Sequence, residues 1–222
     1  MELPSGNILS WSGDHTLRLW SPDGTCKAVL EGHTDEVNGA IELYSGDILS
    51  WSDDCTLRLW FSQTKIKENL KGYTGIVERI IELHSGDILS WSDDHTLRLW
   101  SPDGTCKAVL EGHLDDVNGV IELNSGDILS WSKDSTLRLW SPDGTCKAIM
   151  KGDMFENIQD AEELRSGEIV SRANDYYDKN SYTIRLWSPN GTCKKVIESD
   201  NPQYYSYDSL FLTKSHDSQV IR

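Results

Sequence analysis

Apolar and polar residues alternate along short stretches of this chain, and the alternation is interrupted at regular intervals by turn residues. Within residues 34–71, Val37 to Leu43 is apolar at alternate positions, and Ser45-Gly46-Asp47 predicts a turn. Ile48 to Ser52 and Thr56 to Trp60 follow as the next two strands. In the best copies a Ser-Pro-Asp-Gly turn then leads into a fourth strand, because proline fixes φ and Asp-Gly tolerates positive φ.

This pattern is an internal repeat. The phrase Leu-Ser-Trp-Ser-x-Asp-x-Thr-Leu-Arg-Leu-Trp has a period of 40 residues, and its copies begin at Leu9, Leu49, Leu89 and Leu129. A degenerate fifth copy ends at Trp187. Four strands per period predict the blades of a β-propeller, since one blade cannot cover its own apolar faces and must stack on its neighbours.

We therefore predict an all-β chain that forms one domain over residues 1–222, with five blades of four antiparallel strands. The approximate blade bounds are 1–31 together with 204–213, then 34–71, 74–111, 114–151 and 154–198. Because Met1 to Leu3 aligns with Ile41 to Leu43, the sequence starts inside an innermost strand. Ser206 to Leu212 fits onto Val37 to Leu43, so we expect the C-terminal strand to complete the first blade and close the ring. An open arc, part of a larger ring and closure by a second chain remain alternatives.

The repeated residues resemble those of the WD-repeat (WD40) propeller family. Gly32-His33, Asp54 and Trp60 carry the resemblance, as do Gly112-His113, Asp134 and Trp140 two copies later. The resemblance covers about residues 3–198, and it implies a hydrogen-bonded set of His, Ser, Asp and Trp inside each blade. By position the complete sets are His33, Ser50, Asp54, Trp60 and His113, Ser130, Asp134, Trp140.

Three blades depart from this family pattern at the histidine. Tyr73 takes the place of His in the third blade and Asp153 in the fifth, while Asp200 stands there for the first blade. We call the aspartates of the repeated turn the bracket aspartates and still expect them to be buried in their blades: Asp14, Asp54, Asp94 and Asp134.

Composition narrows the partner class. Thirty-six acidic and 21 basic residues give a net charge of −15, which disfavours nucleic acid and favours a partner segment carrying Lys or Arg. The five cysteines are odd in number and lack Cys-x-x-Cys spacing, so we expect reduced thiols in a cytoplasmic protein, without a metal site. No apolar run predicts a signal peptide or a membrane span.

No catalytic constellation stands out, so we predict a protein that is not an enzyme and has no cofactor. His15 and His95 lie in a repeated turn where other copies have Cys55 or Ser135, although a catalytic group should be unique in its pocket. Neither a phosphate-binding glycine loop, a nucleophile elbow nor a calcium loop occurs.

The early tryptophans of the repeat allow two interpretations. Core packing is the first, because their strands are central and flanked by apolar residues. Repeated sites for glycans or small ligands are the alternative, since indole faces suit both uses. The four residues are Trp11, Trp51, Trp91 and Trp131.

Candidate binding residues lie where the copies differ. Between Ser171 and Trp187 the fifth copy is six residues longer than the fourth copy is between Ser130 and Trp140. This insertion is rich in tyrosine, which supplies contact area at low entropic cost, and Tyr176, Tyr177 and Tyr182 are its candidates.

Two further positions vary within the constant frame: the residue before each bracket aspartate and the entrance of each inner strand. Besides Gly13, they are Glu36, Asn38, Asp53, Ile76, Glu78, Asp93, Asp116, Asn118 and Lys133. We therefore predict a non-catalytic protein- or peptide-binding scaffold, such as the recognition module of a larger protein or complex, with a lectin-like propeller as the alternative. Oligomerisation is expected if one chain does not close the ring.

Overall fold

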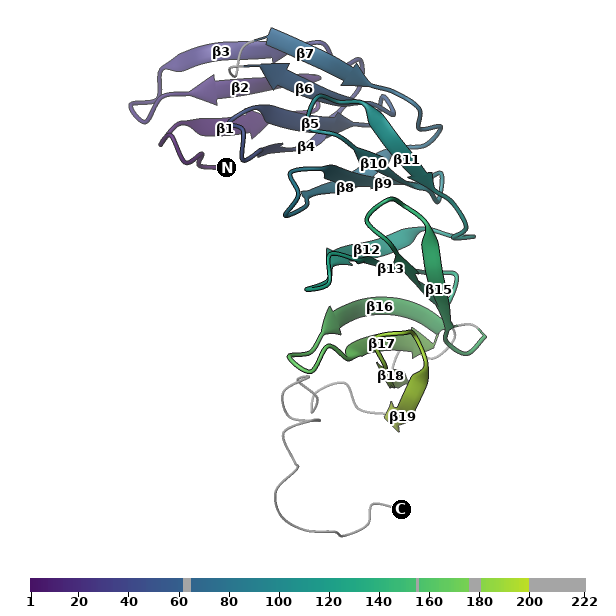
Figure 1. Cartoon of the computed structure of the whole chain (residues 1–222). Helices are drawn as coiled ribbons and strands as arrows, with labels where there is room; N and C mark the ends of the chain where they lie inside the picture. The colour runs from purple at the N-terminus through teal and green to yellow at the C-terminus, as the bar shows by residue number, and fades with distance from the viewer. Residues whose placement is uncertain (62–64, 155, 176–180, 200–222) are drawn as a thin grey trace.

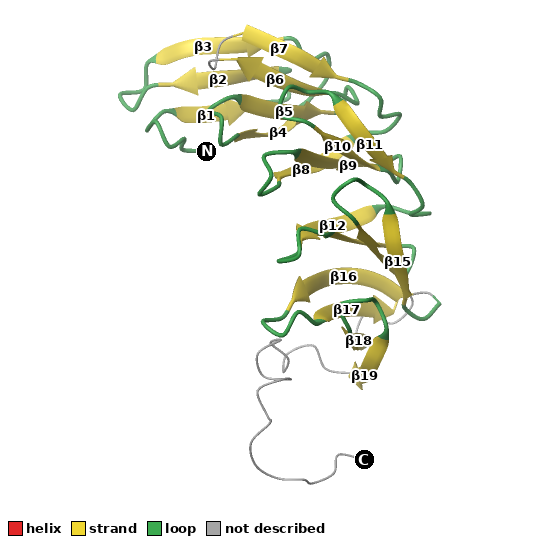
Figure 2. Cartoon of the chain, viewed as in Figure 1, coloured by secondary structure: helices red, strands yellow, loops and turns green. Residues whose placement is uncertain are grey.

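The computed structural model describes residues 1–61, 65–154, 156–175 and 181–199, and all regular structure in these ranges is β-strand (Figure 2). The strands form five antiparallel sheets, in which each strand pairs with its neighbour in sequence. This arrangement confirms the all-β propeller architecture predicted from the repeat. The described residues contain no helix long and apolar enough to cross a membrane.

The sheets follow one another along the chain, and their strand bounds repeat at the predicted interval. The first contains β1 (Ile8–Trp11), β2 (Thr16–Trp20) and β3 (Cys26–Glu31). The second contains β4 (Val37–Glu42), β5 (Ile48–Ser52), β6 (Leu57–Phe61) and β7 (Lys65–Leu70). The third contains β8 (Val77–Glu82), β9 (Ile88–Ser92), β10 (Leu97–Trp100) and β11 (Cys106–Leu110). The fourth contains β12 (Val117–Glu122), β13 (Ile128–Ser132), β14 (Thr136–Trp140) and β15 (Cys146–Lys151). The fifth contains β16 (Glu156–Glu163), β17 (Ile169–Asp175), β18 (Tyr182–Trp187) and β19 (Cys193–Ser199).

Figure 1 shows the five sheets stacked along an open arc, with β4, β8, β12 and β16 on its inner side. Hydrophobic cores lie between successive sheets, where leucines of one blade meet an isoleucine and a tryptophan of the next. Leu49, Leu57 and Leu59 thus pack with Ile88 and Trp100. The same layer recurs between the other blades, and burial of these side chains holds the stack together.

The first sheet differs from the others at its inner edge. Met1 and Leu9 exchange backbone hydrogen bonds of 2.8 Å, and Glu2 pairs with Ile8. Residues 1–3 therefore hold the places of Ile41 to Leu43, and no described residue holds those of Val37 to Ala40 in this sheet. The segment 204–213, predicted to complete this blade, lies outside the described residues, which form an open arc rather than a closed ring.

Candidate functional site

A β-bulge near the start of each inner strand sets the geometry of the candidate site. In β4 the register moves from Val37 opposite Ser52 to Gly39 opposite Trp51, which leaves Asn38 unpaired in the ladder. A bulge changes the direction of the extra side chain and occurs often beside functional sites. The equivalent bulge residues are Glu78 in β8, Asn118 in β12 and Gln159 in β16.

A backbone hydrogen bond brings the second set of variable residues to the same place. The N–H of Asp53 donates to the carbonyl of Glu36 at 3.0 Å. Two further copies form this bond at 3.0 Å, from Asp93 to Ile76 and from Lys133 to Asp116. The turn before each bracket aspartate is thereby fixed beside the entrance of the inner strand, whatever side chains occupy the two positions.

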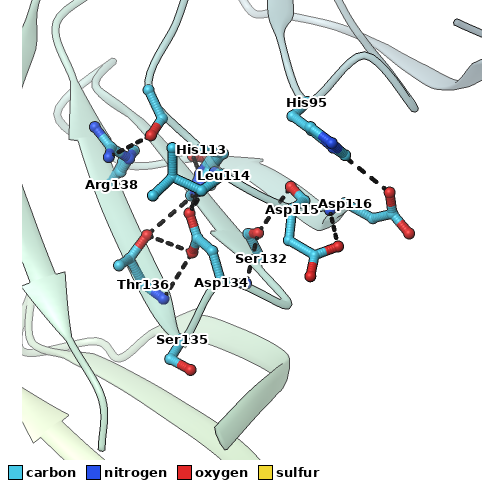
Figure 3. A network of polar contacts seen from close by, with 12 residues as sticks. His95, His113, Leu114, Asp115, Asp116, Ser132, Asp134, Ser135, Thr136 and Arg138 are labelled. Atoms are coloured by element: carbon cyan, nitrogen blue, oxygen red, sulfur yellow. Dashed lines mark hydrogen bonds and ion pairs between the residues drawn. The ribbon is translucent and has the colours of Figure 1, made fainter. Parts of the chain in front are cut away.

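Side-chain contacts join the residues at these positions. The amide of Asn38 donates to Asp53 Oδ1 at 2.6 Å, and the Glu78 carboxyl lies near that of Asp93. Lys133 Nζ lies 2.7 Å from Asp116 Oδ2. On its other oxygen Asp116 faces His95 Nδ1, 3.6 Å away (Figure 3).

Asn118 differs from the other bulge residues because it connects two blades. Its amide donates to Asn157 Oδ1 at 2.6 Å and to the carbonyl of Ile158 at 2.7 Å. In the fifth blade the intrablade contact returns, with Gln159 Nε2 donating to Asn174 Oδ1 at 3.0 Å.

Two adjacent pockets across the second, third and fourth blades share Glu78 and Arg79 as a common wall. The first has a volume of about 510 Å³, and the predicted residues lining it are Asn38, Asp53, Ile76 and Glu78. The second, of about 260 Å³, is lined by Glu78, Asp93, Asp116, Asn118 and Lys133. We call the two pockets together the bulge groove.

Other predicted residues lie outside the bulge groove. The carboxyl carbon of Glu36 would lie 3.5 Å from a Cβ added to Gly13, so these two residues approach each other between the first two blades. Tyr182 begins β18, where it pairs with Asn174. Tyr176 and Tyr177 lie outside the described residues, so their role in binding stays a prediction.

The charges of the bulge groove are mostly negative. Burial raises the pKa of the Glu78 carboxyl, and the nearby Asp93 carboxyl with its negative charge adds to the rise. The hydrogen bond to Asp116 raises the pKa of Lys133 and keeps it protonated. An acidic groove attracts a partner segment with positive charge.

Sequence comparison alone did not single out Arg79, which lines both pockets. In the neighbouring copies this position is glycine, and a Cβ on Gly39 would lie only 2.1 Å from Trp51 Cζ2. On Gly119 it would lie 2.2 Å from Trp131 Cζ2. These tryptophans therefore lie against the inner strand. The Gly-Arg-Gly difference between the aligned copies is the signal that could have identified Arg79.

Burial of the early tryptophans favours their packing role. Trp91 is 4% exposed and Trp131 is 7% exposed, and the Trp131 indole N–H donates to the Gln159 carbonyl at 3.2 Å. Trp51 is half-buried in the first pocket, and only Trp11 is open to solvent. The indole faces thus do not form equivalent exposed platforms around the arc, as repeated glycan sites would require.

The hydrogen-bonded sets implied by the family resemblance form in the second and fourth blades. His33 Nδ1 lies 2.9 Å from Asp54 Oδ2, and its Nε2 lies 2.8 Å from Ser50 Oγ. The Trp60 indole donates to the same Ser50 oxygen at 2.9 Å. His113, Ser130, Asp134 and Trp140 repeat these contacts, and Figure 3 shows His113 on Asp134.

Burial and hydrogen bonding together determine which side chains of these sets are charged. Burial lowers the pKa of His33, so the imidazole is neutral near pH 7. Burial alone would raise the pKa of Asp134, but hydrogen bonds from His113, the Thr136 hydroxyl and the Leu114 N–H lower it well below its usual range. Each set is therefore a polar network that stabilises its blade.

The remaining blades replace the histidine in different ways. The Tyr73 hydroxyl lies 2.7 Å from Ser90 Oγ, and Arg98 lies over the Tyr73 ring at 4.7 Å. In the fifth blade, buried Arg185 forms ion pairs with Glu156 and Asp153. Glu156 was not predicted from the sequence, because the loop before β16 is one residue longer than in the other copies.

The expectation that the bracket aspartate is buried is wrong for Asp14. Its side chain is 43% exposed and forms an ion pair of 2.8 Å with Arg18. No described loop covers this turn in the first blade, whereas Asp54 is covered by the loop that contains His33 and Thr34.

The repeated turn histidines have a structural place. His15 and His95 have φ values of 66° and 64°, and Cys55 and Ser135 share this left-handed conformation. The position is thus the closing residue of a tight turn. Among the described residues, no three His, Cys, Asp or Glu side chains are grouped so that they could hold a metal ion.

Radially stacked antiparallel sheets, tied internally by His-Ser-Asp-Trp networks, define a WD-type β-propeller. Residues 24–60 and 104–141 match the family model "WD domain, G-beta repeat", so these two segments of the chain are WD40-type repeats. A search of curated protein sequences found no match.

Two solved structures share the fold. The chain is similar to the WD40 β-propeller domain of Doa1, with 26% identity and a TM-score of 0.57 over 76% of this chain and 58% of that one. It is also similar to the computationally designed Ika8 protein, with 20% identity and a TM-score of 0.69 over 89% of this chain and 59% of that one. The chain thus spans less than two thirds of the length of either structure.

Proposed function

We propose that this chain is a non-catalytic protein- or peptide-binding scaffold and that the bulge groove is its binding surface. WD40 propeller domains generally act as scaffolds for protein interactions. The proposal rests on the observation that the bulge groove combines three properties. The groove is hollow, it lies where bulges direct side chains, and it holds most of the residues that vary between otherwise similar copies.

The partner segment is proposed to carry Lys or Arg. Asp53, Glu78, Asp93 and Asp116 line the groove, and the pKa of Glu78 is raised in the free protein because its negative charge is poorly accommodated. A cation placed beside Glu78 and Asp93 would relieve their repulsion. Binding is therefore expected to weaken as salt is added.

A charge-reversal experiment tests the groove. The triple variant carries Asp53→Lys, Glu78→Lys and Asp116→Lys, and its binding to an immobilised library of lysine- and arginine-containing peptides is compared with that of the wild-type chain. We expect the variant to lose the peptides that the wild-type chain selects, while its circular dichroism spectrum keeps the β-sheet signal. Retention of every selected peptide would exclude the groove as the binding surface.

A matched control separates a local effect from a change in net charge. Glu31, Glu111 and Glu198 are exposed residues at the outer strands, away from both pockets. Their reversal to lysine changes the total charge by the same amount as the groove variant does. The control variant should therefore still select the wild-type peptides.

The exposed face of the first sheet supports a second kind of association. Ile8 is 43% exposed, whereas its counterparts Ile48, Ile88 and Ile128 are 0% exposed beneath the preceding blade. If one chain does not close the ring, we expect this face to drive oligomerisation. Light scattering of the purified chain measures the mass, and a monomer whose Ile8→Lys variant is equally soluble would contradict the expectation.

A further inference from the structure

Arg79 lies at the centre of the bulge groove and is exposed on β8. It lines both pockets, whose facing walls come from the second blade in the first pocket and from the fourth blade in the second. The Arg79 guanidinium forms no hydrogen bond or ion pair with any described residue, although its charge acts on neighbouring Glu78 and partly offsets the rise that burial causes in the pKa of that carboxyl. Arginine has five donors in a planar fork, so this guanidinium is free to bind a planar acceptor supplied from outside.

Acidic side chains flank Arg79 on both sides. Asp53 lines the first pocket, and Asp93 and Asp116 line the second. The other cation of the groove, Lys133, is already paired with Asp116 at 2.7 Å. Across the two pockets, Arg79 therefore lies between Asp53 on one side and Asp93 on the other, with Glu78 beside it on the shared wall.

We propose that the bulge groove selects an extended partner segment in which an acidic residue lies between two basic residues, and that Arg79 is the residue that determines this selectivity. The central carboxylate binds the Arg79 guanidinium, and the two flanking cations enter the acidic pockets. This inference rests on the proposed function and specifies the partner chemistry of the same groove.

Repulsion contributes to this selectivity as much as attraction does. A segment with three basic residues in succession would place a cation against Arg79, and such a mismatch discriminates against the wrong partner. An exposed ion pair in water contributes little affinity by itself. Arg79 therefore acts mainly on the choice of partner, with an expected preference on the order of threefold for each charge exchanged.

The test uses two sets of short fluorescent peptides on a Gly-Ser background. One set has the order Lys, Glu, Lys and the other has Lys, Lys, Lys, each with several spacings between the charged residues because the groove spans adjacent blades. Fluorescence anisotropy at low salt gives the ratio of the two affinities for the wild-type chain and for Arg79→Glu. The wild-type chain should prefer the Lys, Glu, Lys peptides, and Arg79→Glu should reverse that preference.

Two further variants separate local from general effects. Arg79→Gly introduces the residue that the neighbouring copies carry, so it should fold and lose the preference without reversing it. Arg165→Glu makes the same charge change on an exposed turn outside both pockets and should keep the wild-type preference.

The outcomes separate this inference from the proposed function. A wild-type preference for the Lys, Lys, Lys peptides, or a preference that Arg79→Glu leaves unchanged, overturns the role of Arg79 while peptide binding by the groove stands. If neither peptide set binds at any spacing, the groove is not a basic-peptide site and both proposals fail.

Discussion

Removal of one serine hydroxyl tests whether the hydrogen-bonded sets stabilise the blades. Ser50 is fully buried, and its oxygen contacts two nitrogens, Trp60 Nε1 at 2.9 Å and His33 Nε2 at 2.8 Å. Because Asp54 accepts from Nδ1 and the imidazole is neutral, Nε2 accepts the Ser50 O–H. Ser50→Ala therefore leaves one buried donor and one buried acceptor without a partner.

The magnitude follows from that count. A buried group left unsatisfied costs about 1–3 kcal/mol, so Ser50→Ala, which leaves two, should lower the free energy of unfolding by about 2–6 kcal/mol. Ser171→Ala, which leaves only the buried Trp187 indole unpaired, should cost about 1–3 kcal/mol. Ser10→Ala should cost less than about 1 kcal/mol, because the half-buried Trp20 indole that it releases can turn to water.

Urea unfolding followed by circular dichroism measures these three losses. Repeat arrays can unfold in parts, so amide hydrogen exchange in β5, β17 and β1 should accompany the unfolding curves and locate each loss. The chemical change is the same in all three variants, and only the burial and the number of partners differ. Equal losses for Ser10→Ala and Ser50→Ala would refute the reasoning from buried partners.

Three further changes probe the groove and the blades. Glu78→Gln should raise the thermal midpoint of unfolding near pH 7 and have no effect well below pH 4.5. Folding raises the pKa of Glu78 above its ordinary value of 4.5, so the ionised side chain destabilises the folded protein, and stability is lost as the pH rises above 4.5. His33→Tyr should flatten the loss of stability below about pH 6.5, since the folded pKa of His33 is lowered and its protonation favours the unfolded state, while Ser50 can accept the new hydroxyl. Gly119→Ala should cost about 1–3 kcal/mol in urea unfolding, because the added carbon would collide with Trp131.

Each of these has an internal comparison. Gly13→Ala adds the same carbon where the nearest atom of Glu36 is 3.5 Å away, so it should be close to neutral. A midpoint that falls in Glu78→Gln at neutral pH would contradict the repulsion assigned to Glu78 and Asp93. If His33→Tyr keeps the full acid sensitivity, the sensitivity arises elsewhere in the chain.

The repeat predicted most of the fold because the sequence pattern within each blade is enough to locate the strands of that blade. The strand order, the turns and the pairs of variable positions all follow from local pattern. The bulges were not predictable, because a one-residue register change at Asn38 or Glu78 depends on how two strands pair. The ion pairs of Arg185 with Glu156 and Asp153 also depend on contacts between segments far apart in sequence.

Ring closure could not be predicted reliably from the repeats for the same physical reason. It requires contacts between the two ends of the array, and no repeated pattern encodes such contacts. The alignment placed Met1 to Leu3 in part of the inner strand of the first blade, where Met1 indeed bonds to Leu9 and Glu2 pairs with Ile8. The assignment of residues 204–213 to the rest of that strand stays a prediction. The alignment of repeats shows which positions need a strand, but not which segment supplies it.

The separation between frame and surface explains how near-identical blades can form a specific binding site. The bond from Asp53 to Glu36 and its counterparts in the next two blades join backbone atoms only. The geometry of these hydrogen bonds therefore does not depend on the side chains at those positions. Aspartate can be exchanged for lysine there, as at Lys133, without loss of the turn. In the proposed groove, recognition can then change through single residues such as Arg79, while the buried serine and tryptophan of the second to fifth blades keep the sheets in place.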